Sequence, residues 1–241
     1  MKPNAGKFHQ HLKHVGAALH PAKITRRLET RKLIQDFADS HGLVYFGSVD
    51  HRSDDHRLVR GMTTSAHQED KDYCIGSYNG YDIVFTRRIV KSSSDKVLHN
   101  WLIIQIDLKT QHEMPHMLIG PHIGANGHYD RITSALPALQ PIVLGSFGVI
   151  DRSFTSSYTV YTKPARGIDA QRIVSPEIAG LIGQHFPPLA IEIWDGCTFI
   201  YSTEKHPSDK LLDVMLQNGV WLAQQIDARA DQLREETQSI T

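Results

Sequence analysis

The sequence is poor in cysteine, has no net charge and contains no long apolar run, and each absence excludes a class of protein. Two cysteines among 241 residues are too few for a disulfide framework. Lys and Arg together number 26, as do Asp and Glu, so no overall positive field favours nucleic acid as a partner. The most apolar stretch, residues 136–150, is interrupted by proline and glycine and is too short to cross a bilayer. No apolar run follows the basic N-terminus, which argues against a signal peptide, and we expect a cytoplasmic protein without a membrane segment.

The chain also lacks the common motifs of catalysis and cofactor binding. It has no glycine-rich nucleotide loop and no G-x-S-x-G nucleophile elbow. Cys74 and Cys197 fall within expected strands, where a free thiol behaves as a small buried hydrophobe, and neither lies at a helix start that would activate it. We therefore predict no catalytic residue, no cofactor and no assigned metal site.

Apolar periodicity predicts one domain between two irregular ends. Residues 1–22 are basic and rich in histidine and are expected to form a flexible arm. Residues 23–234 are expected to form a single domain, with a subdivision near 135–141 as the alternative, and residues 235–241 a frayed tail. The domain begins with a helix from Ile24 to Ser40, whose apolar residues share one face: Ile24, Leu28, Leu33, Ile34 and Phe37.

Most of the remaining elements are predicted to be strands joined by tight turns. Asn79-Gly80 and Asp195-Gly196 each separate two alternating apolar runs, the strongest local signal for a β-hairpin. Further strands are expected at 43–49, 97–108, 142–150 and 157–163, loops at 50–72 and 124–134, and helices at 175–183 and 208–234. Because short turns rather than helices join the strands, we predict an α+β protein with a mostly antiparallel sheet.

The segment His112-Glu113-Met114-Pro115-His116 matches the H-E-x-x-H signature of zinc peptidases. That chemistry needs both histidines on one face of a helix. Pro115 would stand inside such a helix, where it clashes with the preceding turn and offers no N–H. The segment is instead predicted to belong to a short strand, in which the two histidines would lie about 13 Å apart, too far for one zinc ion. A zinc hydrolase that uses these residues with His122 is kept as the alternative function.

Histidine is abundant, with 15 residues, and most are expected to be solvated. Because the imidazole titrates near neutrality, an acid-responsive oligomer is a third hypothesis. Two clusters keep metal binding open as an alternative: His116, His122 and His128, and His9, His11 and His14 in the arm.

Three pairs of cationic residues are the remaining candidates for ligand contact. Arg26-Arg27 and Arg31-Lys32 lie on the first predicted helix, and Arg87-Arg88 lies on a strand. A solvated surface explains such pairs in most proteins, and contact with an anion or a phosphate is the alternative.

The C-terminal part resembles a bacterial family known only as a domain of unknown function. The runs that carry the resemblance are DRSFTSSYTVYT (151–162), SPEIAGLI (175–182) and LAIEIWDGCTFIYS (189–202), within residues 145–225. The matching positions are Asp151, Phe154, Tyr158, Val160, Tyr161, Ser175, Pro176, Asp195 and Gly196. The resemblance implies a shared scaffold and brings no catalytic residues. Taken together, the residues predict a non-catalytic binding or interaction domain for an unknown protein or small molecule, of unknown oligomeric state.

Overall fold

The computed structural model describes residues 21–48, 59, 61–63, 68–94, 96–122 and 136–238. Within these residues, nine strands form one sheet in which every neighbouring pair is antiparallel. Across the sheet the strands are β1 (Val44–Gly47), β2 (Gln68–Tyr78), β3 (Tyr81–Lys91), β4 (Val97–Asp107), β9 (Cys197–Ser202), β8 (Ala190–Trp194), β5 (Met117–Pro121), β7 (Tyr158–Thr162) and β6 (Gln140–Ile142). The α+β class with an antiparallel sheet is therefore confirmed.

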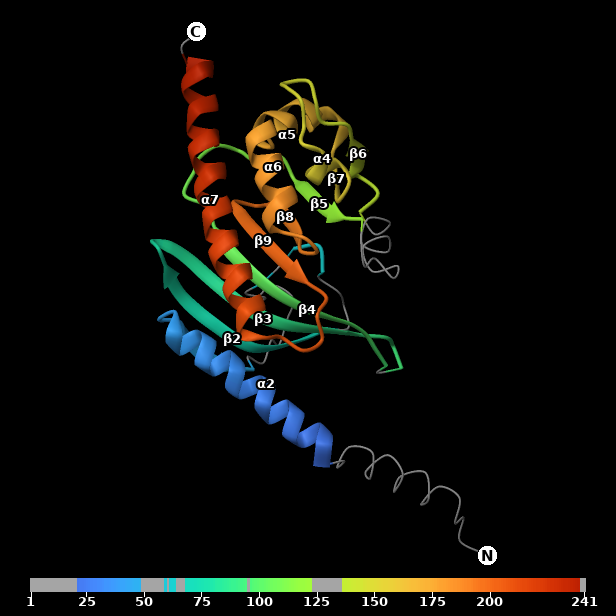
Figure 1. The fold of residues 1–241 in the computed structure, drawn as a ribbon, viewed down its shortest axis with the longest axis vertical. Helices are drawn as coiled ribbons and strands as arrows, with labels where there is room; N and C mark the ends of the chain where they lie inside the picture. Colours follow the sequence, from blue (N-terminus) through green and yellow to red (C-terminus); the bar gives the residue numbers. More distant parts are fainter. Residues whose placement is uncertain are drawn as a thin grey trace, which may run out of the picture.

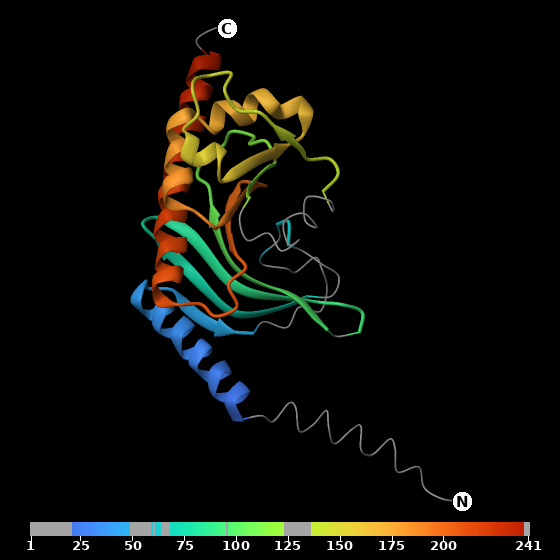
Figure 2. The ribbon, with the colours of Figure 1, turned by 45° about the vertical axis from the view of Figure 1, so that its right-hand side comes forward.

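Two long helices cover one face of this sheet (Figures 1 and 2). The described helices are α2 (Pro21–Ser40), α4 (Arg152–Thr155), the 3-10 helix η2 (Pro164–Arg166), α5 (Gly167–Ile173), α6 (Pro176–His185) and α7 (Asp209–Gln238). Helix α7 contacts β4 and β9, and α2 contacts α7, β1 and β2. The N-terminal half of α2 projects beyond the sheet in Figure 2, and its residues 25–29, 31 and 32 are exposed.

Local signals predicted the two hairpin turns and the start of α6 correctly, whereas α2 begins at Pro21, before the predicted Ile24. Asn79 and Gly80 have φ values of 50° and 78°, and Asp195 and Gly196 have 51° and 71°, as the two hairpin turns require. The Ser175 hydroxyl accepts a hydrogen bond from the Ile178 N–H and caps α6.

The alternation of β4 assigns its side chains to two separate cores. Leu102, Ile104 and Ile106 enter the large core beneath the helices. Trp101 and Ile103 point to the opposite face, where a smaller apolar cluster also contains Val59, Tyr73, Ala190, Phe199 and Tyr201. Both faces of the central strands are therefore buried, which explains why β4 is apolar at every position from Trp101 to Ile106 except Gln105.

Several predictions of local structure were wrong, and the short helices α4 and α5 were not predicted. The strand predicted for 142–150 ends at Ile142, and Gly145 and Gly148 take φ values near 140° in the exposed turn that follows. The loop predicted for 50–72 ends earlier, because β2 begins at Gln68. Leu28 does not join the buried apolar face of α2, since its side chain is 60% exposed. The loop predicted at 124–134, and the arm up to residue 20, lie outside the described residues.

Candidate functional site

The segment 112–116 is an irregular extended connection before β5, so the helix that zinc chemistry needs is not formed. The strand predicted here begins only at Met117. Two of the three polar side chains of the segment, those of Glu113 and His116, are bonded to other protein groups. Glu113 accepts a hydrogen bond from Arg166 at 2.9 Å, and His116 Nε2 lies 2.7 Å from a Glu192 oxygen. The zinc hydrolase alternative therefore has no geometric support.

A side chain of α7 binds the turn at Lys109 and Thr110 that precedes this segment. Asp227, which is buried, accepts hydrogen bonds from the backbone N–H groups of Lys109 and Thr110, at 3.0–3.2 Å. The same carboxylate accepts the Tyr81 hydroxyl at 2.7 Å. The end of β4 is thus held by a side chain 118 positions later, which no local pattern announces.

The other histidine candidates do not converge on one point. His122 bonds to Thr159 through Nε2 at 2.6 Å and to the Ser156 carbonyl through Nδ1 at 3.2 Å. Within the part of the chain that the structure describes, no group of three His, Cys, Asp or Glu side chains is arranged to hold a metal ion. His9, His11, His14 and His128 lie outside the described residues.

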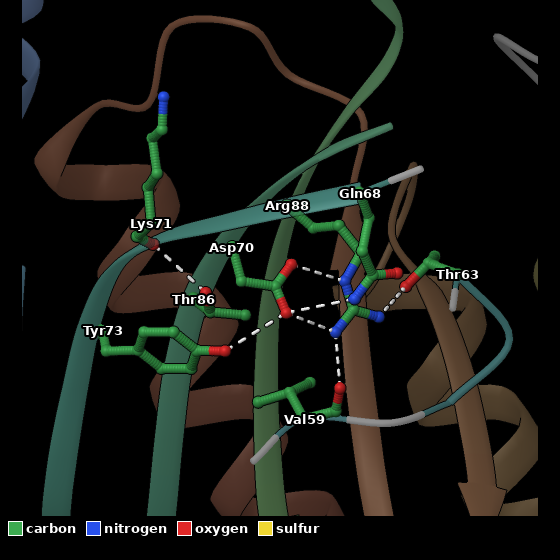
Figure 3. A network of polar contacts seen from close by, with 8 residues as sticks. All are labelled: Val59, Thr63, Gln68, Asp70, Lys71, Tyr73, Thr86 and Arg88. Atoms are coloured by element: carbon green, nitrogen blue, oxygen red, sulfur yellow. Dashed lines mark hydrogen bonds and ion pairs between the residues drawn. The ribbon is translucent and has the colours of Figure 1, made fainter. Parts of the chain in front are cut away.

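The second face of the sheet carries a buried ion pair, drawn in Figure 3. Arg88 is fully buried, and its Nε and Nη2 atoms donate to the two oxygens of Asp70, each at 2.8 Å. Its remaining donors reach the Thr63 hydroxyl and the Val59 carbonyl, and Tyr73 donates to Asp70 at 3.1 Å. This bidentate pair is satisfied on every side, which is the arrangement that makes a buried charge tolerable.

A second carboxylate, Glu192, lies on the same face and is fully buried. It accepts the Tyr201 hydroxyl at 2.5 Å and the Met62 N–H at 2.7 Å in addition to the His116 contact. Burial, followed by the charge of Glu192, raises the pKa of the Tyr201 hydroxyl well above its usual value. Gly61 (φ +83°) passes so close that an added Cβ would overlap Tyr201 and Glu192.

The two polar clusters therefore hold Val59 and residues 61–63 against the sheet. The Val59 carbonyl and the Thr63 hydroxyl accept hydrogen bonds from Arg88, and the Met62 N–H donates to Glu192. Both charged side chains are also bonded to other protein groups. Ionisable groups that are paired with one another in a closed interior position are a structural arrangement more than a reactive one. Burial also raises the pKa of both thiols, Cys74 and Cys197, to about 12, so neither is an activated nucleophile.

An open groove lies on the helix-covered face, at the β1 edge of the sheet. We call it the basic groove. Its volume is about 600 Å³, within the usual range of ligand sites. It is lined by Arg27, Leu28 and Arg31 of α2, Tyr45, Phe46, Gly47 and Ser48 of or just after β1, Glu69, Lys71 and Asp72 of β2, and Arg87 of β3.

The floor of the basic groove is an ordered set of polar contacts around Asp72. This residue sits at an irregularity of β2 with a φ of +56°, a conformation uncommon for a residue other than glycine. Its carboxylate accepts Arg87 Nε and the Tyr45 hydroxyl, both at 2.8 Å. Burial and then the hydrogen bond to Asp72 raise the pKa of Tyr45 to about 12. The Arg31 guanidinium lies over the Tyr45 ring, 5.7 Å from its centre.

The structure brings together one residue from each of the three cationic pairs seen in the sequence. Arg27, Arg31 and Arg87 line the basic groove, whereas Arg26 and Arg88 do not. Sequence reasoning missed Tyr45, Phe46 and Lys71, because they enter the groove only through the packing of α2 beside β1. The alternation of β3 was the one available signal, since it sends Arg87 and Arg88 to opposite faces.

The fold is similar to that of a protein whose structure has been solved. It is similar to the crystal structure of the mycobacterial trehalose monomycolate transport factor A, TtfA, with a TM-score of 0.53 and 13% sequence identity. The match covers 83% of this chain and 93% of that chain, and at this identity it shows a shared fold alone. No protein-family model and no curated protein matches the sequence. Among the described helices of this chain, none is long and apolar enough to cross a membrane.

Proposed function

We propose that the protein is a non-catalytic binding domain and that the basic groove is its binding surface. The observation that carries this proposal is a contrast in how charges are used. On one face, Arg88, Asp70 and Glu192 are buried and satisfied by protein groups. In the basic groove, Arg27 and Arg31 are exposed, and within the described residues neither has a carboxylate partner. Cations held at the rim of a hollow without counter-charges favour contact with another molecule.

The likeness in fold supports the same kind of role. The structure that shares the fold is described as a transport factor, and a binding role without catalysis suits such a protein. Strands that precede and strands that follow the predicted subdivision belong to one sheet, which supports the proposal of a single domain over 23–234. The positions behind the resemblance to the uncharacterised bacterial family, such as the Asp151 and Ser175 caps, are scaffold positions here. Membership of that family therefore stays a proposal. A cytoplasmic location is a separate proposal.

Photo-crosslinking tests the proposed surface directly. A benzophenone amino acid would replace Phe46 in the groove and, as a matched control, Val149, which is 94% exposed outside the groove. After irradiation in native lysate, we expect a discrete adduct at position 46 that the Arg27→Gln/Arg31→Gln background reduces. Equal adducts at both positions, none at position 46, or turnover in a panel of hydrolase substrates would contradict the proposal.

A further inference from the structure

We infer that the basic groove binds an anionic amphiphile, whose phosphate or carboxylate group contacts Arg27 and Arg31 and whose apolar part lies against Leu28 and Phe46. This inference rests on the proposed function and adds the chemical class of the ligand. It combines three observations on the groove: its surplus of positive charge, its exposed apolar side chains and its size.

The charge of the groove is positive and incompletely used. Four cationic and two anionic side chains line it, which leaves a formal surplus of two positive charges. Asp72 is already held by Arg87 and Tyr45. Glu69 is shared between Lys71 at 2.6 Å and Lys91 at 3.1 Å, so it is not available to α2 either. Arg27 and Arg31, one helical turn apart, are therefore left to meet an external oxyanion, to which a guanidinium can donate two parallel hydrogen bonds.

The surrounding sequence adds to this positive field. No Asp or Glu precedes Glu29 in the chain, whereas Lys23, Arg26 and Arg27 do. A local excess of this kind attracts anions even in a protein whose overall charge is zero. The two carboxylates in the floor of the groove make a poor track for a long polyanion, which favours a small ligand with one charged group over nucleic acid.

An anion alone would leave the apolar part of the groove unexplained. Leu28 is 60% exposed and Phe46 is 56% exposed, and both border the same hollow as the two arginines. Large apolar side chains gathered at a concave site, with charged groups beside them, are typical of a site for a molecule with both characters. The volume of about 600 Å³ holds a headgroup and part of a chain and is too small for a folded partner.

Calorimetric titration of the full-length protein with four probes tests the inference. The three amphiphiles are used below their critical micelle concentrations. Dodecyl phosphate and laurate carry the two headgroups, inorganic phosphate has no chain, and dodecyl maltoside has the chain without the charge. We expect both anionic amphiphiles to bind at a ratio of one to one. The two incomplete probes should bind about tenfold more weakly or worse, because each loses one set of contacts. A preference between dodecyl phosphate and laurate would identify the headgroup.

Two pairs of substitutions supply the matched comparison. Arg27→Gln/Arg31→Gln should weaken dodecyl phosphate binding at least about tenfold, since charge-assisted hydrogen bonds are lost. Arg26→Gln/Lys32→Gln makes the same change in charge on the same helix, outside the groove, and should change the affinity by less than about threefold. All four side chains are exposed, so circular dichroism should show folded protein in both cases.

Several results would overturn the inference. Equal affinity for dodecyl maltoside would remove the oxyanion site, and equal affinity for inorganic phosphate would remove the apolar site. Tighter binding of a short single-stranded oligonucleotide, titrated as a fifth probe, would show that the ligand is not an amphiphile. An equal loss in both double variants would indicate a diffuse field instead of a site. If no amphiphile binds but position 46 still gives a discrete crosslinked adduct, this inference fails and the proposed function stands. If neither occurs, both fail.

Discussion

Arg87 and Arg88 are consecutive arginines of β3, yet their side chains belong to two different regions of the molecule. Arg88 is fully buried and forms a network with Asp70 beneath Val59 and Thr63. Arg87 points to the helix-covered face and forms part of the floor of the basic groove with Asp72. The same charge stabilises the fold in one place and lines an open surface in the other. Both arginines bind a buried aspartate, so the difference teaches that the covering segment, more than residue type or the counter-charge, decides what an arginine does.

The largest effect should come from breaking the buried pair. Arg88→Met leaves the Asp70 carboxylate buried without its partner, and we expect a loss of about 3–5 kcal/mol in the free energy of unfolding. Arg87→Met is the control: it also takes an arginine from a buried carboxylate, Asp72, but Tyr45 still donates to that carboxylate and Arg87 borders the open groove, so the cost should be smaller, about 1–2 kcal/mol. Urea denaturation of the three proteins measures both values. Equal losses would show that the two regions do not differ as described.

The close approach of Gly61 to the Glu192 cluster should give the second largest effect. Gly61→Ala adds a methyl group that overlaps Tyr201 and Glu192 and also strains a φ of +83°, so we expect a loss of about 2–3 kcal/mol. Gly196→Ala has a similar φ of +71° with open space around the new group, and should cost about 1 kcal/mol. Thermal and urea unfolding would compare them, and a cost at Gly196 as large as that at Gly61 would refute the steric explanation.

Alkaline pH should destabilise both regions through their tyrosines, and the cost of removing each hydroxyl at neutral pH should distinguish them. The folded-state pKa of Tyr45 is raised from 10.0 to about 12, so its contribution to stability is complete below pH 10 and is lost as the pH rises towards 12. Tyr201 shifts in the same direction. Tyr45→Phe and Tyr201→Phe should each flatten the decline in stability above pH 10. At neutral pH, Tyr201→Phe should cost about 1 kcal/mol because buried Glu192 loses a donor, and Tyr45→Phe should cost less. Unfolding curves between pH 7 and 11.5 would detect a steep unchanged decline, which would contradict the assignment.

The smallest effect on stability is expected at the rim of the groove. Arg27→Gln/Arg31→Gln should change the free energy of unfolding by no more than about 0.5 kcal/mol, since both side chains are exposed and lack carboxylate partners within the described residues. The same variant should lose amphiphile binding. Urea denaturation beside the calorimetric titration provides the comparison, and a loss of stability above 1 kcal/mol would show that these arginines are structural.

The elements that the sequence predicted well depend on residues close together in the chain. Asn79-Gly80 and Asp195-Gly196 adopt positive φ values that few other residues take cheaply, so both hairpins were readable. Pro115 excluded a helix through the HEMPH segment for an equally local reason. The stretch 142–150 misled because its apolar residues suggested burial, whereas Val149 is exposed in a turn that its glycines shape.

By itself, the sequence determined the class of fold, the turns and which residues of β3 and β4 share a face, because backbone sterics and a period of two act over a few residues. Tertiary structure alone decided the rest. Asp227 holds the end of β4 from a distance of 118 positions, and Arg31 meets Tyr45 only because α2 packs beside β1. The basic groove is assembled from α2, β1, β2 and β3, and the satisfaction of each charge depends on partners far away in the chain. No local pattern contains that information, because long-range packing chooses which faces meet.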